Sequence, residues 1–399
     1  MTRRGRADVA VVGGGVVGAA CALALSRLDL DVVLIEANEP APWDPATPDL
    51  RVYAFAPDSA ALLDGLDAWR DVCAARAQPY RRMRVWDAAS AGELVFDADA
   101  YGRRELGWIV EHGLLVDRLW TGLRRSAVTV RCPARVEALA LRDDGVELRL
   151  DDGARIAARI AVAADGAEST LRALAGLEVD RRDYAQSGVV AYVDTEASHE
   201  ATAWQRFLPG GPLAFLPCAD GTSSIVWTLP DGAAREVLAL EDAAFARALT
   251  RAFDARLGAA TPRSRRVAFP LRRQLAQRYL AGRVLVVGDA AHVVHPLAGQ
   301  GVNLGLRDVA ALRDVVADAK TRKAEWDAPQ RLARWARTRR SENAVAAHAF
   351  DGINRMFSND GVAATLLRGP LLGLVGTMPP LLAAFWRRAG GKSSAAEGR

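Results

Sequence analysis

The chain has 399 residues, 50% of them hydrophobic and 25% charged, which is enough apolar material for a large folded core and excludes a disordered chain. This length predicts two or three structural units. The 52 Lys and Arg residues exceed the 48 Asp and Glu residues by only four, so the charge gives no indication of nucleic-acid binding.

The cysteines and the apolar runs exclude further classes. Cys21, Cys73, Cys132 and Cys218 lie far apart without a CxxC pair, so we expect neither a zinc site nor a disulfide framework. No uninterrupted apolar run reaches the length of about 18 residues that a membrane-spanning helix needs. The N-terminal charges lead into a glycine-rich turn, so we predict no targeting segment and a cytoplasmic protein.

The first 36 residues predict a strand, a helix and a second strand. Apart from Asp31, residues 9–12 and 31–35 are apolar and rich in β-branched side chains, as in strands buried on both faces of a parallel sheet. Between them, Gly13, Gly15 and Gly18 form a GxGxxG pattern, in which the glycines allow a tight turn, the approach of a pyrophosphate and close helix packing. Glu36 ends the second strand, where a carboxylate accepts hydrogen bonds from a ribose, which favours FAD or NAD over NADP.

A third buried strand is predicted at residues 160–164, directly before Asp165 and Gly166. The residues alone leave two interpretations of this turn. Asp165 either only caps the helix that follows, or belongs to a functional site at the end of the strand.

A fourth strand is predicted at residues 283–287, and it leads into Gly288 and Asp289. A helix opens after Gly299, Gln300 and Gly301, and its free N–H groups and positive dipole end favour an anionic ligand. His292 and His295 lie in the intervening turn without a carboxylate or cysteine cluster, so we expect no metal there. A purely structural, hydrogen-bonded role for either histidine stays open.

These motifs resemble those of the group A FAD-dependent monooxygenases related to para-hydroxybenzoate hydroxylase. The resemblance rests on residues 283–308, on Asp165-Gly166 and on the segment around Arg51. It implies that Asp289 binds the ribityl and pyrophosphate part of FAD and that Arg51 contacts FAD. It also implies that Asp165-Gly166 serves both FAD and incoming NADPH or NADH. The cofactor-binding residues implied or predicted are Gly13, Gly15, Gly18, Glu36, Arg51, Asp165, Gly166, Gly288, Asp289, Gly299, Gln300, Gly301 and Asn303.

Other segments resemble the ubiquinone-biosynthesis hydroxylase branch of that family, namely residues 204–217, 224–227 and 351–360, His295-Pro296 and Met378-Pro379-Pro380. The branch implies hydroxylation of a lipid-soluble phenol or quinol with a polyprenyl tail by O2. No catalytic base is assigned, although His295 and Pro296 are expected near the flavin ring. A monooxygenase acting on a soluble natural-product aromatic and a non-catalytic flavin-binding scaffold of a quinone-biosynthesis complex stay open as alternatives.

One segment departs from the family pattern. Gly113 and Val116 stand where related sequences carry an arginine and a glutamine that contacts the cofactor. We therefore expect side-chain polar contacts to FAD to be missing at these two positions.

The predicted fold class is α/β, or α+β overall. We expect a Rossmann-like FAD-binding domain of the para-hydroxybenzoate hydroxylase type, a substrate domain with an antiparallel sheet, and C-terminal helices. The substrate domain is predicted to contain two strands in residues 204–227 and a helix at residues 241–256. The FAD-binding domain takes residues 1–75, 103–180 and 265–325, the substrate domain takes 76–102 and 181–264, and a helical region takes 326–399.

A membrane contact is the last expectation. The segment from Leu366 to Arg388 combines leucines with Arg368, Arg387 and Arg388, which suits peripheral contact at the inner face of an anionic membrane. The same leucines would also suit simple packing against the FAD-binding domain, and that alternative stays open.

Overall fold

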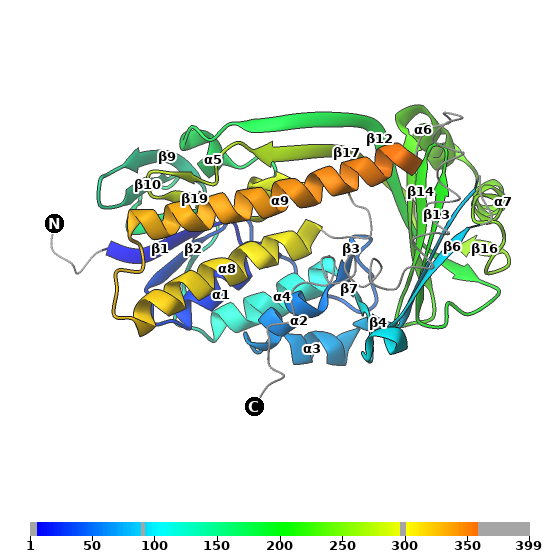
Figure 1. The fold of residues 1–399 in the computed structure, drawn as a ribbon, viewed down its shortest axis with the longest axis horizontal. Coiled ribbons are helices and arrows are strands. Elements are labelled where there is room, and N and C mark those ends of the chain that lie inside the picture. The colour runs from blue at the N-terminus through cyan, green and yellow to red at the C-terminus, as the bar shows by residue number, and fades with distance from the viewer. Residues whose placement is uncertain (1–5, 89–91, 296–300, 358–399) are drawn as a thin grey trace.

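The computed structural model describes residues 6–88, 92–295 and 301–357, and these stretches form three sheets with helices packed around them (Figure 1). An eight-stranded sheet with its helices lies toward one end of the long axis, and a nine-stranded sheet stands at the other end (Figure 1). The predicted α/β class with an added antiparallel sheet is therefore confirmed for the described residues.

The eight-stranded sheet carries the first glycine turn. Its strands are β1 (Arg6–Val12), β2 (Val32–Ile35), β8 (Thr129–Arg131), β9 (Val136–Leu141), β10 (Val146–Leu150), β11 (Arg155–Ala163), β18 (Leu280–Ala281) and β19 (Val284–Val286). The order is β18-β19-β11-β1-β2-β8, and β10 pairs with β11 and β9. Val9 of β1 lies opposite Val32 of β2 and Ile160 of β11 in parallel register. All three are fully buried, as their apolar runs predicted.

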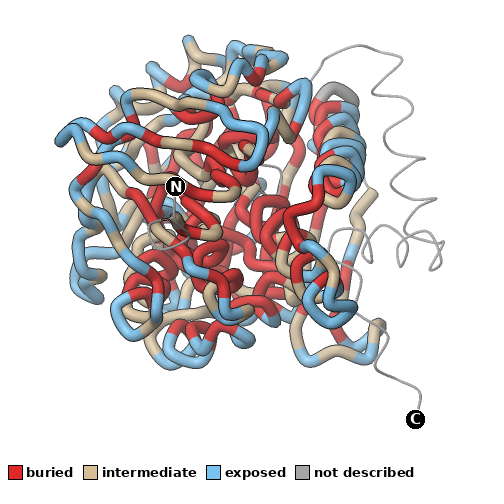
Figure 2. The backbone as a smooth tube through the Cα atoms, turned by 90° about the vertical axis from the view of Figure 1, so that its left-hand side faces the viewer, coloured by how far each residue is buried: buried red, intermediate tan, exposed pale blue. Residues whose placement is uncertain are grey.

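Helices cover this sheet and bury its core. They are α1 (Val16–Ser26), α4 (His112–Arg124), α5 (Thr170–Leu174), α8 (Gly301–Thr321) and α9 (Pro329–Phe357). Helix α1 contacts both α4 and α8, and its small residues Ala19, Ala20 and Ala22 are completely buried. Figure 2 shows the resulting pattern, in which the buried backbone fills the centre and the exposed backbone lies at the rim.

The nine-stranded sheet is built from distant parts of the chain. Its strands are β5 (Arg82–Asp87), β6 (Glu93–Asp97), β12 (Val179–Thr195), β13 (Thr202–Leu208), β14 (Gly211–Pro217), β15 (Ser223–Pro230), β16 (Ala260–Pro262), β17 (Val267–Ala276) and β20 (His292–Val293). The order is β20-β17-β12-β15-β14-β13-β5-β6, and β16 pairs with β12. Helices α6 (Asp231–Ala239) and α7 (Asp242–Ala252) pack against it; α7 falls within the helix predicted at residues 241–256.

The prediction of two strands in residues 204–227 was wrong, because the region forms three. Residues 204–217 fold back on themselves as the hairpin of β13 and β14, with Leu208 paired to Gly211. Gly211 adopts φ +137°, and a Cβ at this position would lie 2.6 Å from Thr228 Cγ2. The Pro-Gly-Gly turn therefore divides what the apolar pattern presented as one strand.

The chain also forms a small three-stranded sheet. It consists of β3 (Val52–Phe55), β4 (Gln78–Tyr80) and β7 (Gly107–Glu111), in the order β3-β7-β4. Helices α2 (Pro57–Asp64) and α3 (Trp69–Ala75) follow β3, and a short 3-10 helix, η2 (Ala98–Tyr101), follows β6.

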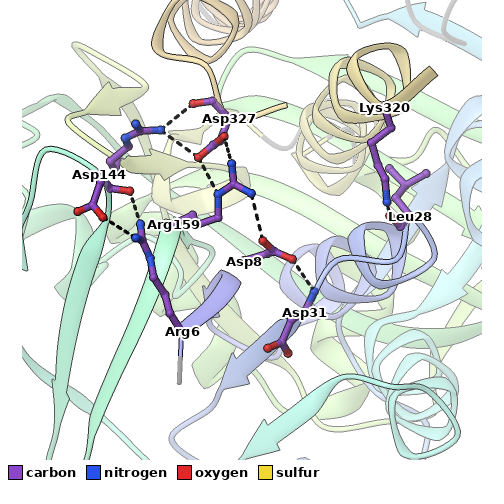
Figure 3. A network of polar contacts seen from close by, with 9 residues as sticks. Arg6, Asp8, Leu28, Asp31, Asp144, Arg159, Lys320 and Asp327 are labelled. Carbon is purple, nitrogen blue, oxygen red and sulfur yellow. Dashed lines mark hydrogen bonds and ion pairs between the residues drawn. The ribbon is translucent and has the colours of Figure 1, made fainter. Parts of the chain in front are cut away.

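A polar network fastens the connection between α8 and α9 to the start of β1 (Figure 3). The guanidinium of Arg159 donates to Asp327 at 3.0 Å and to Asp8 at 3.4 Å. Asp8 in turn accepts a hydrogen bond from the backbone N–H of Asp31. Arg283, the residue before β19, donates to the carbonyl oxygen of Asp327 at 2.7 Å. Charged groups from three neighbouring segments thus hold the connection that leads into α9.

The division into domains stays a prediction, but several strands can be placed against it. β17 falls in the segment 265–325 assigned to the FAD-binding domain, yet it pairs with β12 in the nine-stranded sheet. β4 falls in the segment 76–102 assigned to the substrate domain, yet it pairs with β7. Helix α9 makes up most of the described part of the segment 326–399, and it packs on α8.

Candidate active site

A cavity of about 920 Å³ is lined by the first glycine turn and by both large sheets, a size near the upper end for ligand pockets. Three groups of residues line it. The eight-stranded sheet contributes Gly13, Gly15, Glu36 and Ala37; the middle carries Arg51, Tyr53, His112, Asp165, Gly166 and Asp289; and the nine-stranded sheet contributes Val190, Gln205, Leu216, Val226, Thr228 and Leu271.

The first glycine turn exposes backbone to this cavity. Gly13 has φ +105°, and a Cβ there would lie 2.4 Å from the carbonyl oxygen of Ala164. A Cβ on Gly18 would lie 1.9 Å from the carbonyl oxygen of Gly13, so α1 can pack this closely against the turn only with glycine at position 18. At Gly15 a Cβ would meet nothing within 4 Å. The turn therefore leaves open backbone at the start of α1, where a pyrophosphate can approach.

The Glu36 carboxylate lies in the cavity wall and stabilises this turn. Its Oε2 accepts a hydrogen bond from the backbone N–H of Gly14 at 2.5 Å, and its Oε1 accepts one from the N–H of Asn38 at 3.0 Å. A carboxylate has about four acceptor positions, so two remain for ribose hydroxyls. Trp120 adds a contact that could not be predicted from the sequence: its Nε1 donates to the carbonyl oxygen of Gly14 at 2.7 Å.

Arg51 and Asp289 lie opposite each other in the middle of the cavity. Arg51 Nη2 is 3.8 Å from Asp289 Oδ2, and their side chains are 54% and 43% exposed. An ion pair this exposed contributes little to stability, so both groups are free to contact a ligand. Asp289 sits on the 3-10 helix η3 (Gly288–Ala290), directly after β19.

Tyr53 and His112 line the cavity beside Arg51, and the sequence analysis assigned no role to either. The Arg51 guanidinium lies 5.3 Å from the centre of the Tyr53 ring, and the Tyr53 hydroxyl is 3.0 Å from Nδ1 of His112. Burial and the nearby Arg51 charge lower the pKa of His112 to about 4. Burial raises the pKa of Tyr53. Both side chains are therefore uncharged at neutral pH.

Asp165 and Gly166 line the cavity at the end of β11. The Asp165 carboxylate braces the start of α5, since it accepts hydrogen bonds from the Ser169 hydroxyl and from the N–H of Leu171. The carboxylate thus has a local structural role while the residue also lies at the cavity wall.

Two further predicted site residues, Gly288 and Asn303, lie away from the cavity lining. Gly288 donates its N–H to Asp308 at 3.1 Å. Asn303 is buried, and its side-chain amide bonds to the carbonyl oxygen of Ala54 and to the N–H of Ala56. Gly301, the first residue of α8, lines the cavity, whereas Pro296, Gly299 and Gln300 lie outside the described residues.

The positions that depart from the family pattern also lie away from the cavity. Val116 is buried in the core that surrounds the eight-stranded sheet. Gly113 donates its backbone N–H to Asp49 Oδ2 at 3.0 Å.

The nine-stranded sheet presents a mainly apolar surface to the cavity. Val190 of β12 lines the cavity, while its neighbours Val189 and Ala191 pack on the other face with Phe245 of α7. This alternation follows from the strand period of two. Leu216, Val226 and Leu271 extend the apolar surface, and Gln205 and Thr228 add polar groups. Such a surface can hold an apolar ring and exclude water.

His295 lines the cavity at this end, and its side chain is buried. Neither ring nitrogen has a hydrogen-bond partner within the described stretches. The ring meets Tyr184 edge-on, with 5.2 Å between ring centres, and burial lowers the pKa of His295 to about 4. His292 does not line the cavity. Its Nε2 lies 2.7 Å from Oδ2 of the buried Asp308.

The lining residues fit FAD. The open backbone at Gly15 suits a pyrophosphate, Glu36 keeps acceptor positions for an adenosine ribose, and Arg51 and Asp289 offer a cation and an acceptor for the middle of the molecule. These residues would hold FAD, which would supply redox chemistry to the cavity.

Comparison with known proteins agrees with this reading. Residues 6–347 match the model of the FAD binding domain family. The chain is 40% identical to the 3-demethoxyubiquinol 3-hydroxylase of Escherichia coli (strain K12), over 88% of this chain and 90% of that protein. It is 39% identical to the ubiquinone hydroxylase UbiL of Rhodospirillum rubrum, over 96% of this chain and 90% of that protein.

Solved structures show the same fold at lower identity. The p-nitrophenol 4-monooxygenase PnpA of Pseudomonas putida superposes with a TM-score of 0.77 and 22% identity, covering 98% of this chain and 99% of that chain. Klebsiella pneumoniae HpxO, solved with FAD and uric acid, superposes with a TM-score of 0.71 and 19% identity, covering 94% and 97%. Because residues 6–347 match the family model and both relatives are more than 30% identical over most of the chain, the chain belongs to the FAD binding domain family and, within it, to the ubiquinone-biosynthesis flavin hydroxylases.

Proposed function

We propose that this protein uses FAD, NADPH or NADH, and O2 to hydroxylate the aromatic ring of a polyprenyl phenol or quinol in ubiquinone biosynthesis. The observation that carries the proposal is the continuity of the cavity, which joins the dinucleotide turn at Gly15 to the apolar surface at Val190, Leu216 and Val226. The relatives named 3-demethoxyubiquinol 3-hydroxylase and ubiquinone hydroxylase UbiL support the choice of substrate.

The two ends of the cavity supply different parts of the activity. FAD, when bound, supplies hydride acceptance and oxygen activation. The protein's own residues bind and orient, and the apolar sheet surface keeps water from the ring that reacts. Gln205 and Thr228 lie on this surface, where they can orient a ring that carries hydroxyl or methoxy groups.

Two measurements test this function against its rivals. Purified holoprotein should oxidise NADPH or NADH faster when a short-chain prenyl phenol is added, and the hydroxylated ring should be found by mass spectrometry. A flavin-binding scaffold would show no such acceleration. Deletion of the gene in its host should cause a ubiquinone precursor to accumulate, whereas an enzyme for a soluble aromatic would leave ubiquinone unchanged.

We further propose a peripheral contact with the inner face of the membrane, where a polyprenyl substrate resides. No helix in the described stretches is both long and apolar enough to cross a bilayer. The segment from Leu366 to Arg388 lies outside those stretches, so its apolar and basic sequence is the support. Wild type should float with anionic liposomes at low salt more than a Trp386→Ala, Arg387→Glu, Arg388→Glu variant does. Equal flotation of the two proteins would exclude this segment as the contact.

A further inference from the structure

We propose that His112 donates a hydrogen bond to the central, ribityl and pyrophosphate part of FAD, and that Tyr53 fixes the imidazole tautomer this requires. The proposal rests on FAD binding, which the proposed function also needs, and is independent of the substrate.

The fold sets both side chains beside each other at the cavity wall. Tyr53 lies in β3, which pairs antiparallel with β7 and places Tyr53 opposite Val110. His112 follows β7 as the first residue of α4, and its backbone N–H donates to the carbonyl oxygen of Arg51 at 2.9 Å. Among the residues of α4, only His112 lines the cavity, where Arg51 and Asp289 are its neighbours along the wall.

The contact between the two side chains determines where the imidazole proton lies. A neutral imidazole carries one N–H, and the Tyr53 hydroxyl is 3.0 Å from Nδ1. When this hydroxyl donates to Nδ1, the ring proton is on Nε2. No described residue bonds to Nε2 of His112, so the N–H is available to an acceptor oxygen in the cavity.

Burial favours a neutral donor at this point. It is the largest cause that lowers the pKa of His112, and the Arg51 charge lowers it further, whereas Asp49 and Asp289 raise it by less than these two together lower it. His112 therefore stays neutral beside these ions and adds a directed N–H without another charge.

His112 also compensates for the two departures from the family pattern. Val116 is buried in the core and the backbone of Gly113 is bonded to Asp49, so neither residue brings a polar side chain to the cavity. His112 places a donor at the start of the same helix.

Titration of apoprotein with FAD, followed by quenching of flavin fluorescence, tests the contact without reference to turnover. His112→Leu should raise the Kd for FAD by about tenfold or more, the effect of losing a hydrogen bond to a charged or strongly polar group. His112→Gln, which keeps an amide N–H, should stay within about threefold of wild type. His348→Gln is the matched control, because His348 is exposed and lies outside the cavity lining. Wild-type affinity in a folded His112→Leu variant would overturn the proposal.

The role of Tyr53 needs a different readout, because it acts through His112. Tyr53→Phe retains the ring under Arg51 and removes only the hydroxyl. It should weaken FAD binding by less than His112→Leu does, and the double variant should bind FAD no more weakly than His112→Leu alone. Additive losses in the double variant would overturn the positioning role.

Nitrogen-15 NMR of the imidazoles gives a direct test of the tautomer. The chain has five histidines, so His112→Gln identifies the His112 signals by their loss. Wild type should show the proton on Nε2, and Tyr53→Phe should shift the signals toward a mixture of tautomers. A proton on Nδ1 in wild type would contradict the proposed arrangement. Loss of the hydroxylase function with intact FAD binding would leave this proposal standing, so the two can fail separately.

Discussion

Arg172 is joined to Ala290 by a hydrogen bond of 2.9 Å from its guanidinium Nη1 to the carbonyl oxygen, although the two residues are 118 positions apart. The same nitrogen donates to the carbonyl oxygen of Ala167, also at 2.9 Å. Ala167 follows Asp165-Gly166, and Ala290 follows Asp289. One buried guanidinium therefore fixes the distance between two turns that line the cavity.

We expect Arg172→Leu to lower the free energy of unfolding by about 2–4 kcal/mol, because the buried carbonyl group of Ala290 and the partly buried one of Ala167 lose a charged donor. Thermal and urea unfolding of the FAD-free protein measure this. Arg155→Leu is the control, since Arg155 is 70% exposed in its ion pair with Glu147 and should change stability by less than about 0.5 kcal/mol. Similar losses in both variants would show that Arg172 has no special role in joining the turns.

The strands of the eight-stranded sheet could be predicted because their signal is local. The runs at residues 9–12, 31–35, 160–164 and 283–287 each overlap a strand of this sheet, and the burial of these strands on both faces explains the apolar composition. The glycine turn and Glu36 could be predicted for the same reason, since a dinucleotide turn needs particular residues at fixed spacing.

Contacts between distant segments could not be predicted. Trp120 appears in the sequence as one more apolar residue of an amphipathic helix, yet its indole bonds to the first glycine turn. β5 pairs in parallel with β13, more than a hundred residues away, and no pattern within either strand specifies this partner. Asn303 was predicted at the cofactor, and its side chain instead joins α8 to the chain at residues 54–56.

We expect Asp289→Ala to lose most of its FAD during purification, because the carboxylate faces the middle of the cavity opposite Arg51. The ratio of flavin absorbance to protein absorbance measures occupancy. Asp314→Ala, which removes an exposed carboxylate on α8, should keep wild-type occupancy. Normal FAD content in Asp289→Ala would place the ribityl site elsewhere.

Replacement of Glu36 by Ala should weaken FAD binding by about 1–3 kcal/mol, the usual effect of losing a charge-assisted hydrogen bond. The variant also frees the N–H of Gly14, which Glu36 holds at 2.5 Å. Titration of apoprotein with FAD gives the difference in Kd, and Glu39→Ala on the nearby surface is the control. An unchanged Kd for Glu36→Ala would mean that the carboxylate serves only the turn.

Asp308 lies at the centre of a buried polar cluster that holds the turn carrying Asp289. Its Oδ1 accepts hydrogen bonds from Arg339 Nε at 2.8 Å and from Asn343 Nδ2 at 2.9 Å. Its Oδ2 accepts from the N–H of Gly288 at 3.1 Å and lies 2.7 Å from His292 Nε2. Burial alone would raise the pKa of Asp308, but the contacts with His292 and Arg339 hold it below its usual range.

The lowered pKa of Asp308 sets the sign of a pH dependence. A carboxyl group whose pKa is lower in the folded than in the unfolded protein stabilises the fold above its unfolded pKa, about 3.9, and loses that contribution as the pH falls through the folded value. We expect Asp308→Asn to lower the free energy of unfolding at pH 7 by about 3–5 kcal/mol, because Arg339 loses its buried counter-charge and keeps only the half-exposed Glu342. The deficit relative to wild type should shrink as the pH is lowered below about 4, as the wild-type carboxylate becomes protonated. Urea unfolding across this range measures both effects, with Asp314→Asn as the exposed control on the same helix. A deficit that stays constant down to the lowest pH at which wild type remains folded would show that shape, rather than charge, makes Asp308 necessary.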